Sequence, residues 1–428
     1  MGEGIKLGGG AGGVINAVID EFLSVSGDIS ANSFVEFFSQ TSSGTNTQCT
    51  TLEVTNSIVR GCVLNNSKAF LLIANGNDSS LYGVVLNLSG TSITVGSSVK
   101  VGDKALCGCA TIDEGRVFIA YNNANDQRTV RVLTISGTSI SAGTALTVDV
   151  SGDSPDRFIP IVMPNGYVYL VISDVLKGVQ GVLFKVSGTT ITVSRGTHAV
   201  GANTSGTGAP CAAVRLDDNR IFVYYIYWTG EQTSTNRRQR GVVVTISNGA
   251  ASVGTVTELS NLYNYVSSVS VCKVSDNKVM CVFDDPNTGK AMHAFIVNVS
   301  GITLSVGSRY TIRSGVSSSS KSIGQYAVRL RDGICAIASV NSATLYFVSI
   351  VGTEIEVINS ISYSSTIRGG ELIVTNGGKI LVISTNSGTP YTQIIKYVNG
   401  IRPSITQING LTRTIATTTK PGKVWVLP

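Results

Sequence analysis

The stretch LNLSGTSITVG, residues 86–96, is a β-type phrase that recurs along the whole chain. In each copy an apolar-x-apolar stretch leads into a small turn, and a second short β-type stretch follows. Gly or Asn at the turn can supply the positive φ that a tight hairpin needs. Successive turn residues lie 47 to 60 positions apart. The seven copies have their turn residue at Gly90, Gly137, Gly188, Asn248, Gly301, Gly352 and Gly400.

A second phrase, a polar turn followed by an apolar strand, lies upstream of each of these turns. Typical copies are IDEGRVFIAY at 112–121 and LDDNRIFVYY at 216–225. Together the two phrases predict four strands in each unit. In the second unit we expect strands at about 105–112, 116–122, 129–135 and 139–148.

Seven such units predict an all-β chain folded as a seven-bladed β-propeller with four-stranded blades. A solenoid is the alternative, but a unit of four antiparallel strands favours radial packing. The composition agrees, because Gly is abundant (47 of 428 residues) and only 14% of residues are charged, against about 25% in typical soluble domains. A mean hydropathy of +0.25 argues against a disordered chain.

The two ends of the chain do not follow the repeat. Residues 1–13 are a glycine-rich arm, and residues 14–46 are expected to form an N-terminal attachment segment of two strands or a short helix. The propeller is expected over 47–403. Residues 404–428 are expected to be a closing β segment. Because ring closure brings the first and last blades together, we expect both ends to form one small terminal β module.

Composition also bears on the partners of the protein. The net charge is +6 and the basic residues are scattered. This density of positive charge is too low to indicate nucleic-acid binding. The longest apolar run, 221–228, has the length of a strand, so no membrane insertion is expected. The start of the chain lacks the apolar stretch of a secretion signal.

Eight cysteines and two histidines bear on metal and disulfide chemistry. The histidines, His198 and His293, are too few to complete a Cys/His zinc site. Several cysteines lie within apolar runs and form no C-x-x-C pair, so we expect buried free thiols. The sequence therefore predicts no metal site and no cofactor.

Catalytic patterns are weak as well. Gly8, Gly10 and Gly13 fit G-x-G-x-x-G, but no βαβ unit surrounds them, as dinucleotide binding requires. A sialidase-type propeller would need Asp boxes that end in Trp, and the two tryptophans, Trp228 and Trp425, do not lie at that spacing. No catalytic residue is therefore predicted. Carboxylate pairs at 217–218 and 284–285 fall in expected turns, where Asp is ordinary.

The candidate binding site lies on the variable loops. In a propeller the first–second and third–fourth turns share one face, while the second–third and fourth–first loops share the other. Function on a rigid scaffold usually resides in variable loops. The largest insertion, TGEQTSTNRRQR at 229–240, follows an aromatic strand and would place stacking rings beside cations, suited to a sugar, a polyanionic polymer or a protein. The candidate ligand-binding residues are Tyr225, Tyr227, Trp228, Arg237, Arg238, Arg240, Asp284 and Asp285.

Other polar residues are expected on the same loop face. Asn122, Asn125 and Asp126 in YNNANDQR, with the two aspartates of CVFDDPNTGK, could hydrogen-bond a glycan or hold Ca²⁺. No repeated ligand spacing supports calcium, and the ordinary interpretation is a set of solvated loop residues.

The termini carry a family resemblance. GIKLGGGAGG at 4–13, VSGDISANSFVEFF at 25–38 and INGLTRTIATTTKPGKVWVL at 408–427 resemble the flanks of tail-associated virion proteins of phages that infect Gram-positive bacteria. The resemblance implies a tail, baseplate or fibre component with a seven-bladed propeller between its ends. It supplies no residue-level site.

These observations predict a non-enzymatic virion protein, assembled in the host cytoplasm and multimeric in the particle. Residues 1–40 and 404–428 would bind other virion proteins. The propeller would bind a host cell-surface glycan or protein, or another virion protein. The alternatives are a purely architectural tail, neck or capsid decoration protein and a glycan-processing propeller enzyme.

Overall fold

The computed structural model describes most of the chain between residues 24 and 403. The described ranges are 24–25, 35–50, 58–103, 106–148, 155–174, 177–201, 210–228, 237–260, 266, 268–285, 291–315, 326–331, 333–338, 342–364, 370–386 and 389–403. Two compact units are distinguished, one of residues 1–42 with 396–428 and one of residues 43–395. Within the described ranges, no helix is both long and apolar enough to cross a membrane.

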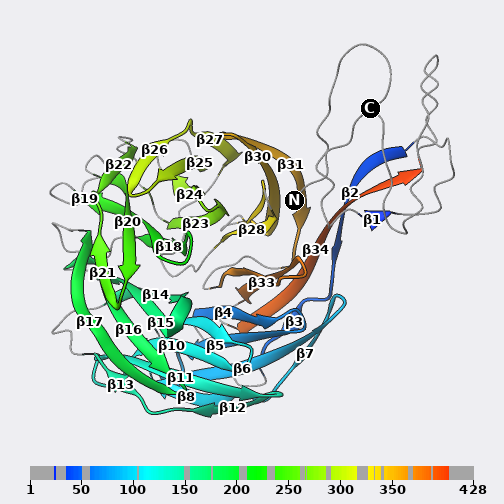
Figure 1. Ribbon diagram of the computed structural model, residues 1–428. Helices are drawn as coiled ribbons and strands as arrows, with labels where there is room; N and C mark the ends of the chain where they lie inside the picture. Colours follow the sequence, from blue (N-terminus) through cyan, green and yellow to red (C-terminus); the bar gives the residue numbers. More distant parts are fainter. Residues whose placement is uncertain are drawn as a thin grey trace, which may run out of the picture. The chain divides into compact units, whose positions relative to one another are not determined.

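The larger unit is the predicted seven-bladed β-propeller, whose seven blades are antiparallel sheets (Figure 1). The seventh sheet also continues into the smaller unit through β1 and β2. Six blades are consecutive in the chain, and the seventh contains β32–β34 with strands from the N-terminal side. In each blade the strands are ordered from the innermost to the outermost. The bounds of blades 1 to 3 are β4 (Ile58–Asn65), β5 (Lys68–Asn75), β6 (Ser80–Ser89), β7 (Ser92–Val95) with β8 (Val99–Asp103); β9 (Cys107–Asp113), β10 (Arg116–Asn122), β11 (Arg128–Ser136), β12 (Ser139–Ala142) with β13 (Leu146–Thr147); β14 (Pro155–Met163), η1 (Pro164–Gly166), β15 (Tyr167–Asp174), β16 (Gly178–Ser187) and β17 (Thr190–Gly201).

The remaining blades follow the same order. Their bounds are β18 (Cys211–Arg215), β19 (Arg220–Trp228), β20 (Arg237–Ser247), β21 (Ala250–Val253) with β22 (Thr257–Ser260); β23 (Ser268–Ser275), β24 (Lys278–Asp285), β25 (Ala291–Ser300), β26 (Thr303–Val306) with β27 (Tyr310–Ser314); β28 (Ala327–Arg331), β29 (Ile334–Ala338), β30 (Thr344–Val351), β31 (Glu354–Ser362); and β32 (Leu372–Val374), β33 (Lys379–Asn386), β34 (Thr389–Pro403) with β3 (Thr47–Gln48), β2 (Val35–Ser43) and β1 (Ser24–Val25). The second blade confirms all four strands expected from the sequence.

Apolar clusters between adjacent blades form the core. The second strands are buried along almost their whole length, since both faces contact a neighbouring blade. Between blades 2 and 3, for example, the rings of Phe118 and Phe184 lie 5.7 Å apart. Burying a side chain of this size stabilises the fold by roughly 1.5–3 kcal/mol. All eight cysteines are free and seven are buried, as expected, and burial raises the pKa of the Cys107 thiol to about 12.

Six of the seven predicted hairpin turns are present. Their turn residues have positive φ, from +50° at Asn248 to +63° at Gly137. A Cβ atom at Gly90, Gly137 or Gly301 would meet nothing within 4 Å. Glycine is therefore favoured at these turns by backbone conformation and not by lack of space, and Asn248 adopts the same conformation in blade 4.

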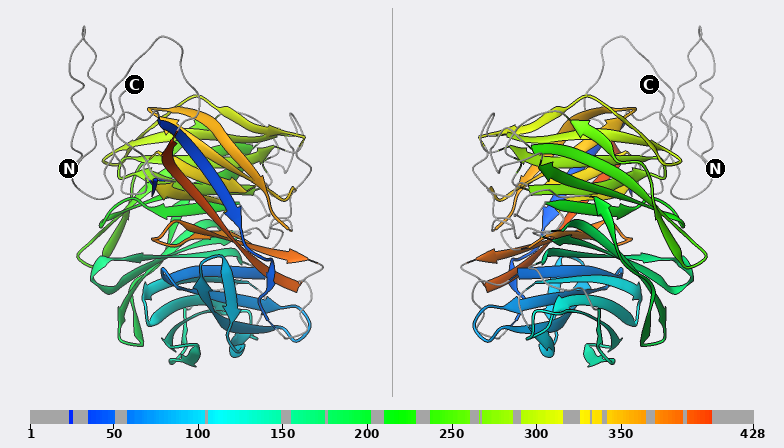
Figure 2. Two further views of the ribbon diagram at one scale, coloured as in Figure 1. Left: turned by 90° about the vertical axis from the view of Figure 1, so that its right-hand side faces the viewer. Right: turned by 90° about the vertical axis from the view of Figure 1, so that its left-hand side faces the viewer.

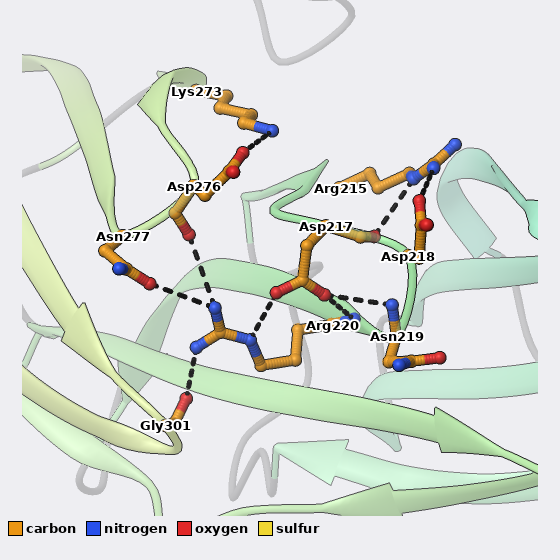
Figure 3. A network of polar contacts seen from close by, with 9 residues as sticks. All are labelled: Arg215, Asp217, Asp218, Asn219, Arg220, Lys273, Asp276, Asn277 and Gly301. Carbon is orange, nitrogen blue, oxygen red and sulfur yellow. Dashed lines mark hydrogen bonds and ion pairs between the residues drawn. The ribbon is translucent and has the colours of Figure 1, made fainter.

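A basic residue at the start of the second strand connects neighbouring blades. The Arg220 guanidinium donates to Asp217 in its own turn and, at 2.9 Å, to the carbonyl oxygen of Gly301 in the third–fourth turn of the next blade (Figure 3). Lysine at the same position makes the same contact elsewhere. We call this contact the blade latch; its donors and acceptors are Lys68 to Gly137, Arg116 to Gly188, Arg220 to Gly301 and Lys278 to Gly352. In blade 7, Lys379 reaches blade 1 differently, through the carbonyl oxygens of Asn66 and Leu88.

A glycine in the outer strand makes a second contact between blades. Its N–H bonds back to the third strand of its own blade, as from Gly96 to Val85 O at 2.8 Å. A Cβ atom on it would come within 2.9–3.3 Å of the second residue of the third–fourth turn in the next blade. The glycines and the residues they face are Gly96 and Thr138, Gly143 and Thr189, Gly254 and Ile302, and Gly307 and Thr353.

The chain start closes the ring. Gly44 donates to Ile394 O at 2.8 Å and lies against Thr91 of blade 1, so it is the equivalent of Gly96 in blade 7. Strand β3 pairs with β34 at Thr47 and Thr392, and Figure 2 shows β2 running beside β34. The outer strand of blade 7 thus comes from the N-terminal side of the chain.

The prediction of a turn at Gly400 is wrong. Strand β34 continues to Pro403, and Gly400 pairs in parallel with Ser24 of β1. Because blade 7 takes its outer strand from the chain start, it needs no third–fourth turn. The glycine-rich arm and the closing segment 404–428 lie outside the described residues, so the predicted packing of the two ends is not described beyond β1 and β2.

The blade latch makes a testable contribution to stability. We expect Arg220→Gln to lower the free energy of unfolding by about 1–2 kcal/mol, because it removes charge-assisted hydrogen bonds to two blades. Arg215→Gln is the matched control, since Arg215 bonds only within its own turn and should cost less than about 0.5 kcal/mol. Denaturant titration measures both. Equal losses of unfolding free energy in the two variants would show that the contact between blades does not contribute to stability.

Ring closure can be tested at Gly44. A Cβ atom there would meet Thr91 O at 2.0 Å, whereas at Gly115 the nearest atom would be 3.6 Å away. We expect Gly44→Ala to destabilise the propeller by about 1–3 kcal/mol, and Gly115→Ala to change stability little. If thermal unfolding moves equally for both variants, blade 7 is not closed by residues 43–48.

Candidate functional site

The two faces of the propeller differ in how its strands are joined. On one face, the third–fourth turns have two residues and the first–second turns two to four. On the other face, the second–third connections have two to eight residues and the fourth–first connections up to twelve, the longest being 229–236 and 315–326. These bounds agree with the expected division into a uniform face and a variable face.

Four of the candidate residues lie together on the β19–β20 hairpin of blade 4, next to the 229–236 connection. Tyr225 pairs with Arg240, and Tyr227 pairs with Arg238, across the two strands. Because side chains alternate along a strand, all four lie on one face of the sheet. The Arg240 guanidinium lies 3.5 Å from the centre of the Tyr227 ring, a close cation–π contact.

The four residues differ in what they can offer a ligand. Tyr225 is 1% exposed and packs against Gly201, so it belongs to the core between blades 3 and 4. Arg238 forms a 2.6 Å ion pair with Glu258, which offsets part of its charge. Tyr227 and Arg240 are half-buried. The accessible part of the candidate site is therefore the stack of Tyr227 and Arg240.

The sequence placed Arg237, Arg238 and Arg240 in a loop, and this is wrong. They belong to β20, because the aromatic strand β19 needs an antiparallel partner over its full length. The backbone register places Trp228 opposite Arg237. The side chains of these two residues, with residues 229–236, lie outside the described part of the chain.

The two candidate aspartates, Asp284 and Asp285, do not lie in a turn. They end strand β24 of blade 5, where they are 0% and 1% exposed. Ser268 donates to Asp284 Oδ2 at 2.8 Å. Burial raises the pKa of Asp284 to about 7, although the Ser268 hydrogen bond and the charge of Arg313 lower it. These carboxyl groups are internal and are not surface contacts for a glycan.

The polar residues of YNNANDQR mostly build their own turn. Asn122 is buried at the end of β10. The Asn123 side-chain oxygen accepts from the backbone N–H of Asn125 at 3.0 Å and of Gln127 at 2.9 Å, and Asp126 adopts a φ of +60°. Among the described residues, no group of three or more His, Cys, Asp or Glu could hold a metal ion.

A cavity of about 120 Å³ on the propeller axis is a second candidate that the sequence did not single out. Its lining comes from the innermost strands of six blades. The charged members are Arg60, Arg157 and Glu371. Arg157 donates to Cys211 O at 2.7 Å, and Glu371 accepts from the N–H of Gly61. The available signal was an arginine in each of two mostly apolar inner strands, IVRGCVLN and PDRFIPIVM.

A hollow on the uniform face, between the turns of blades 4 and 5, has a different character (Figure 3). Its basic residues are bonded to its acidic ones: Arg215 to Asp218, Arg220 to Asp217, and Lys273 to Asp276. The charges balance and the same arrangement recurs at Arg116 and Asp113. This network is part of the blade latch and is not a ligand site.

Comparisons with known proteins support the fold and nothing finer. No family model matches the chain, and no curated protein matches it. Among solved structures, it is similar to the WD40 domain of Toxoplasma gondii coronin, with 8% identity over 87% of each chain and a TM-score of 0.53. A candidate 6-phosphogluconolactonase from Bacteroides uniformis matches with 12% identity over 71% of this chain and 85% of the other, at a TM-score of 0.53. At such identities the likeness shows only a propeller.

The buried carboxyl group of Asp284 predicts a pH dependence. Its pKa is about 7 when folded and near 4 when unfolded. Burial therefore costs nothing below about pH 4, and the cost grows as the pH rises to 7. We expect Asp284→Asn to gain stability relative to wild type between pH 4 and 8, by about 2–4 kcal/mol. Asp217→Asn, at a carboxyl group whose pKa is lowered, should stay nearly parallel to wild type over this range, because the stability added by that carboxylate is lost only as the pH falls below about 4. Denaturant titrations at pH 4 and pH 8 measure the free energy of unfolding of each variant. If this free energy changes with pH equally in Asp284→Asn and wild type, the pKa of Asp284 is not raised.

Proposed function

We propose that the protein is a non-enzymatic component of a phage virion, in the tail, baseplate or fibre, and that the variable face of its propeller binds the host surface. Its terminal segments, 1–40 and 404–428, attach it to other virion proteins. The proposal includes no catalytic step and no cofactor. In this role the chain is assembled in the host cytoplasm and is present in several copies on the particle.

The difference between the two faces is the observation that carries the binding part. The uniform face is tied together by the latches. Arg116 and Arg220 are ion-paired with aspartates, and the latch lysines donate to backbone carbonyl oxygens, so this face offers a ligand few hydrogen-bonding groups that are not already engaged. The opposite face carries connections of unequal length above a rigid ring, the usual arrangement of a binding surface. The stack of Tyr227 and Arg240 lies at its edge, and an aromatic ring beside a cation suits the ring of a sugar.

The virion part rests on the termini. The glycine-rich start and the stretches at 25–38 and 408–427 resemble the flanks of tail-associated proteins of phages of Gram-positive bacteria. Several copies on one particle would suit a weak surface ligand, because linked sites raise avidity about 10²- to 10⁴-fold.

Competition for adsorption tests the proposal. Purified full-length protein should block adsorption of the particles to host cells. The double variant Tyr227→Ala, Arg240→Ala should need at least about tenfold more protein for the same effect, since it loses the stacking pair. Arg215→Gln, at the first–second turn of the same blade and so on the uniform face, is the control and should compete like wild type. Thermal unfolding of each variant shows that it is folded.

Other outcomes contradict the proposal in distinguishable ways. If wild-type protein never competes, yet particles assembled without it are defective, the protein is architectural. Release of soluble sugar from host wall material by the purified protein would show a glycan-processing enzyme.

A further inference from the structure

Seven inner-strand residues form one layer around the axial cavity. The strand register identifies them, because each bonds or pairs with the fifth residue of the second strand of its blade. Arg60 pairs with Leu72 in this way, and the backbone of Glu371 accepts from the N–H of Ile383. The layer is Arg60, Gly108, Ile159, Ala212, Ser270, Tyr326 and Glu371.

Small residues keep part of this layer open. Gly108, Ala212 and Ser270 present little or no side chain to the axis. At Gly108 a Cβ atom would meet Phe158 O at 2.3 Å, so the neighbouring inner strands already touch there. The Ser270 side chain is engaged by the N–H groups of Tyr326 and Ala327, at 3.1 Å each. The remaining space is the cavity of about 120 Å³.

The charges facing this space do not balance. Among the described residues that line it, two are cationic, Arg60 and Arg157, and one, Glu371, is anionic. However they pair with one another, one positive charge is in excess. Burial and the charge of Arg60 both lower the pKa of Arg157, which indicates that the two guanidinium groups act on each other. An uncompensated charge in such a place is costly unless an anion joins it.

We propose that the axial cavity binds a small oxyanion, held by the guanidinium groups of Arg60 and Arg157. Guanidinium is planar and presents paired N–H donors that fit the oxygens of phosphate or carboxylate groups. The volume is enough for several water molecules, so the site can take a small oxyanion such as phosphate. This inference does not depend on the virion role.

Anion titration at constant ionic strength tests the site. Inorganic phosphate should raise the melting temperature of the full-length protein saturably, as expected for a ligand of the folded state. Acetate in a parallel titration shows whether carboxylate serves as well. Arg157→Gln should weaken phosphate binding by at least about tenfold. Arg131→Gln is the matched control, because Arg131 is a half-buried arginine that bonds Val101 O away from the cavity, and its response should match wild type.

A second variant keeps the test decisive if Arg157→Gln does not fold. Glu371→Gln retains the oxygen that accepts from Gly61 but removes the only lining carboxylate among the described residues, so phosphate should bind several-fold more tightly. A purely structural glutamate would not produce this gain. If neither phosphate nor acetate stabilises wild type beyond chloride at the same ionic strength, or if Glu371→Gln leaves the affinity unchanged, there is no oxyanion site.

Discussion

The contact between one blade and the next is the constraint on which the rest of the structure depends. A four-stranded blade buries both faces of its second and third strands only against its neighbours, so no blade is complete alone. The blade latch fixes that packing at the rim. A Lys or Arg at the head of one second strand reaches a turn carbonyl of the following blade, as Arg116 reaches Gly188. The outer-strand glycine, as at Gly96, lets the same turn approach closely.

Two departures from this pattern follow from the closure of the ring. Blade 6 carries Ile334 where five other blades have Lys or Arg, and its neighbour, blade 7, has no third–fourth turn to accept a bond. Gly44 replaces the missing outer-strand glycine from the far end of the chain. Closure by an N-terminal strand thus explains both the missing latch of blade 6 and the absence of a hairpin at Gly400. Blade 3 also lacks the latch, because it has Tyr167 at the position of the basic residue, and closure does not account for that.

The sequence was sufficient to predict the blades because their signals are local. A turn glycine and an alternating strand lie within a dozen residues of each other, and blade 2 was predicted nearly strand for strand. Closure could not be predicted in this way, since the pairing of Thr47 with Thr392 joins residues far apart in the chain. The KYVNGIRPSI phrase has the composition of a turn, but β34 finds its partners in the N-terminal segment and remains extended.

The candidate site shows the same limit. Aromatic and basic residues near the longest second–third connection were identified correctly as neighbours, and Tyr227 and Arg240 do stack. The sequence alone does not show which side chains are buried, so it wrongly predicts Tyr225, Asp284 and Asp285 as surface groups. The arginines of the axial cavity were missed because only the register of seven separate strands brings Arg60, Arg157 and Glu371 to one axis.

The proposed function places a rigid propeller on a particle. The blade latches hold its uniform face together, and its variable face binds the host surface. Immunogold electron microscopy of the phage particles, with antibody against this chain, tests that claim most directly. We expect label at the tail tip, baseplate or fibres. Label confined to the head, neck or tail tube would contradict host binding, and particles without label would contradict the virion assignment while leaving the propeller intact.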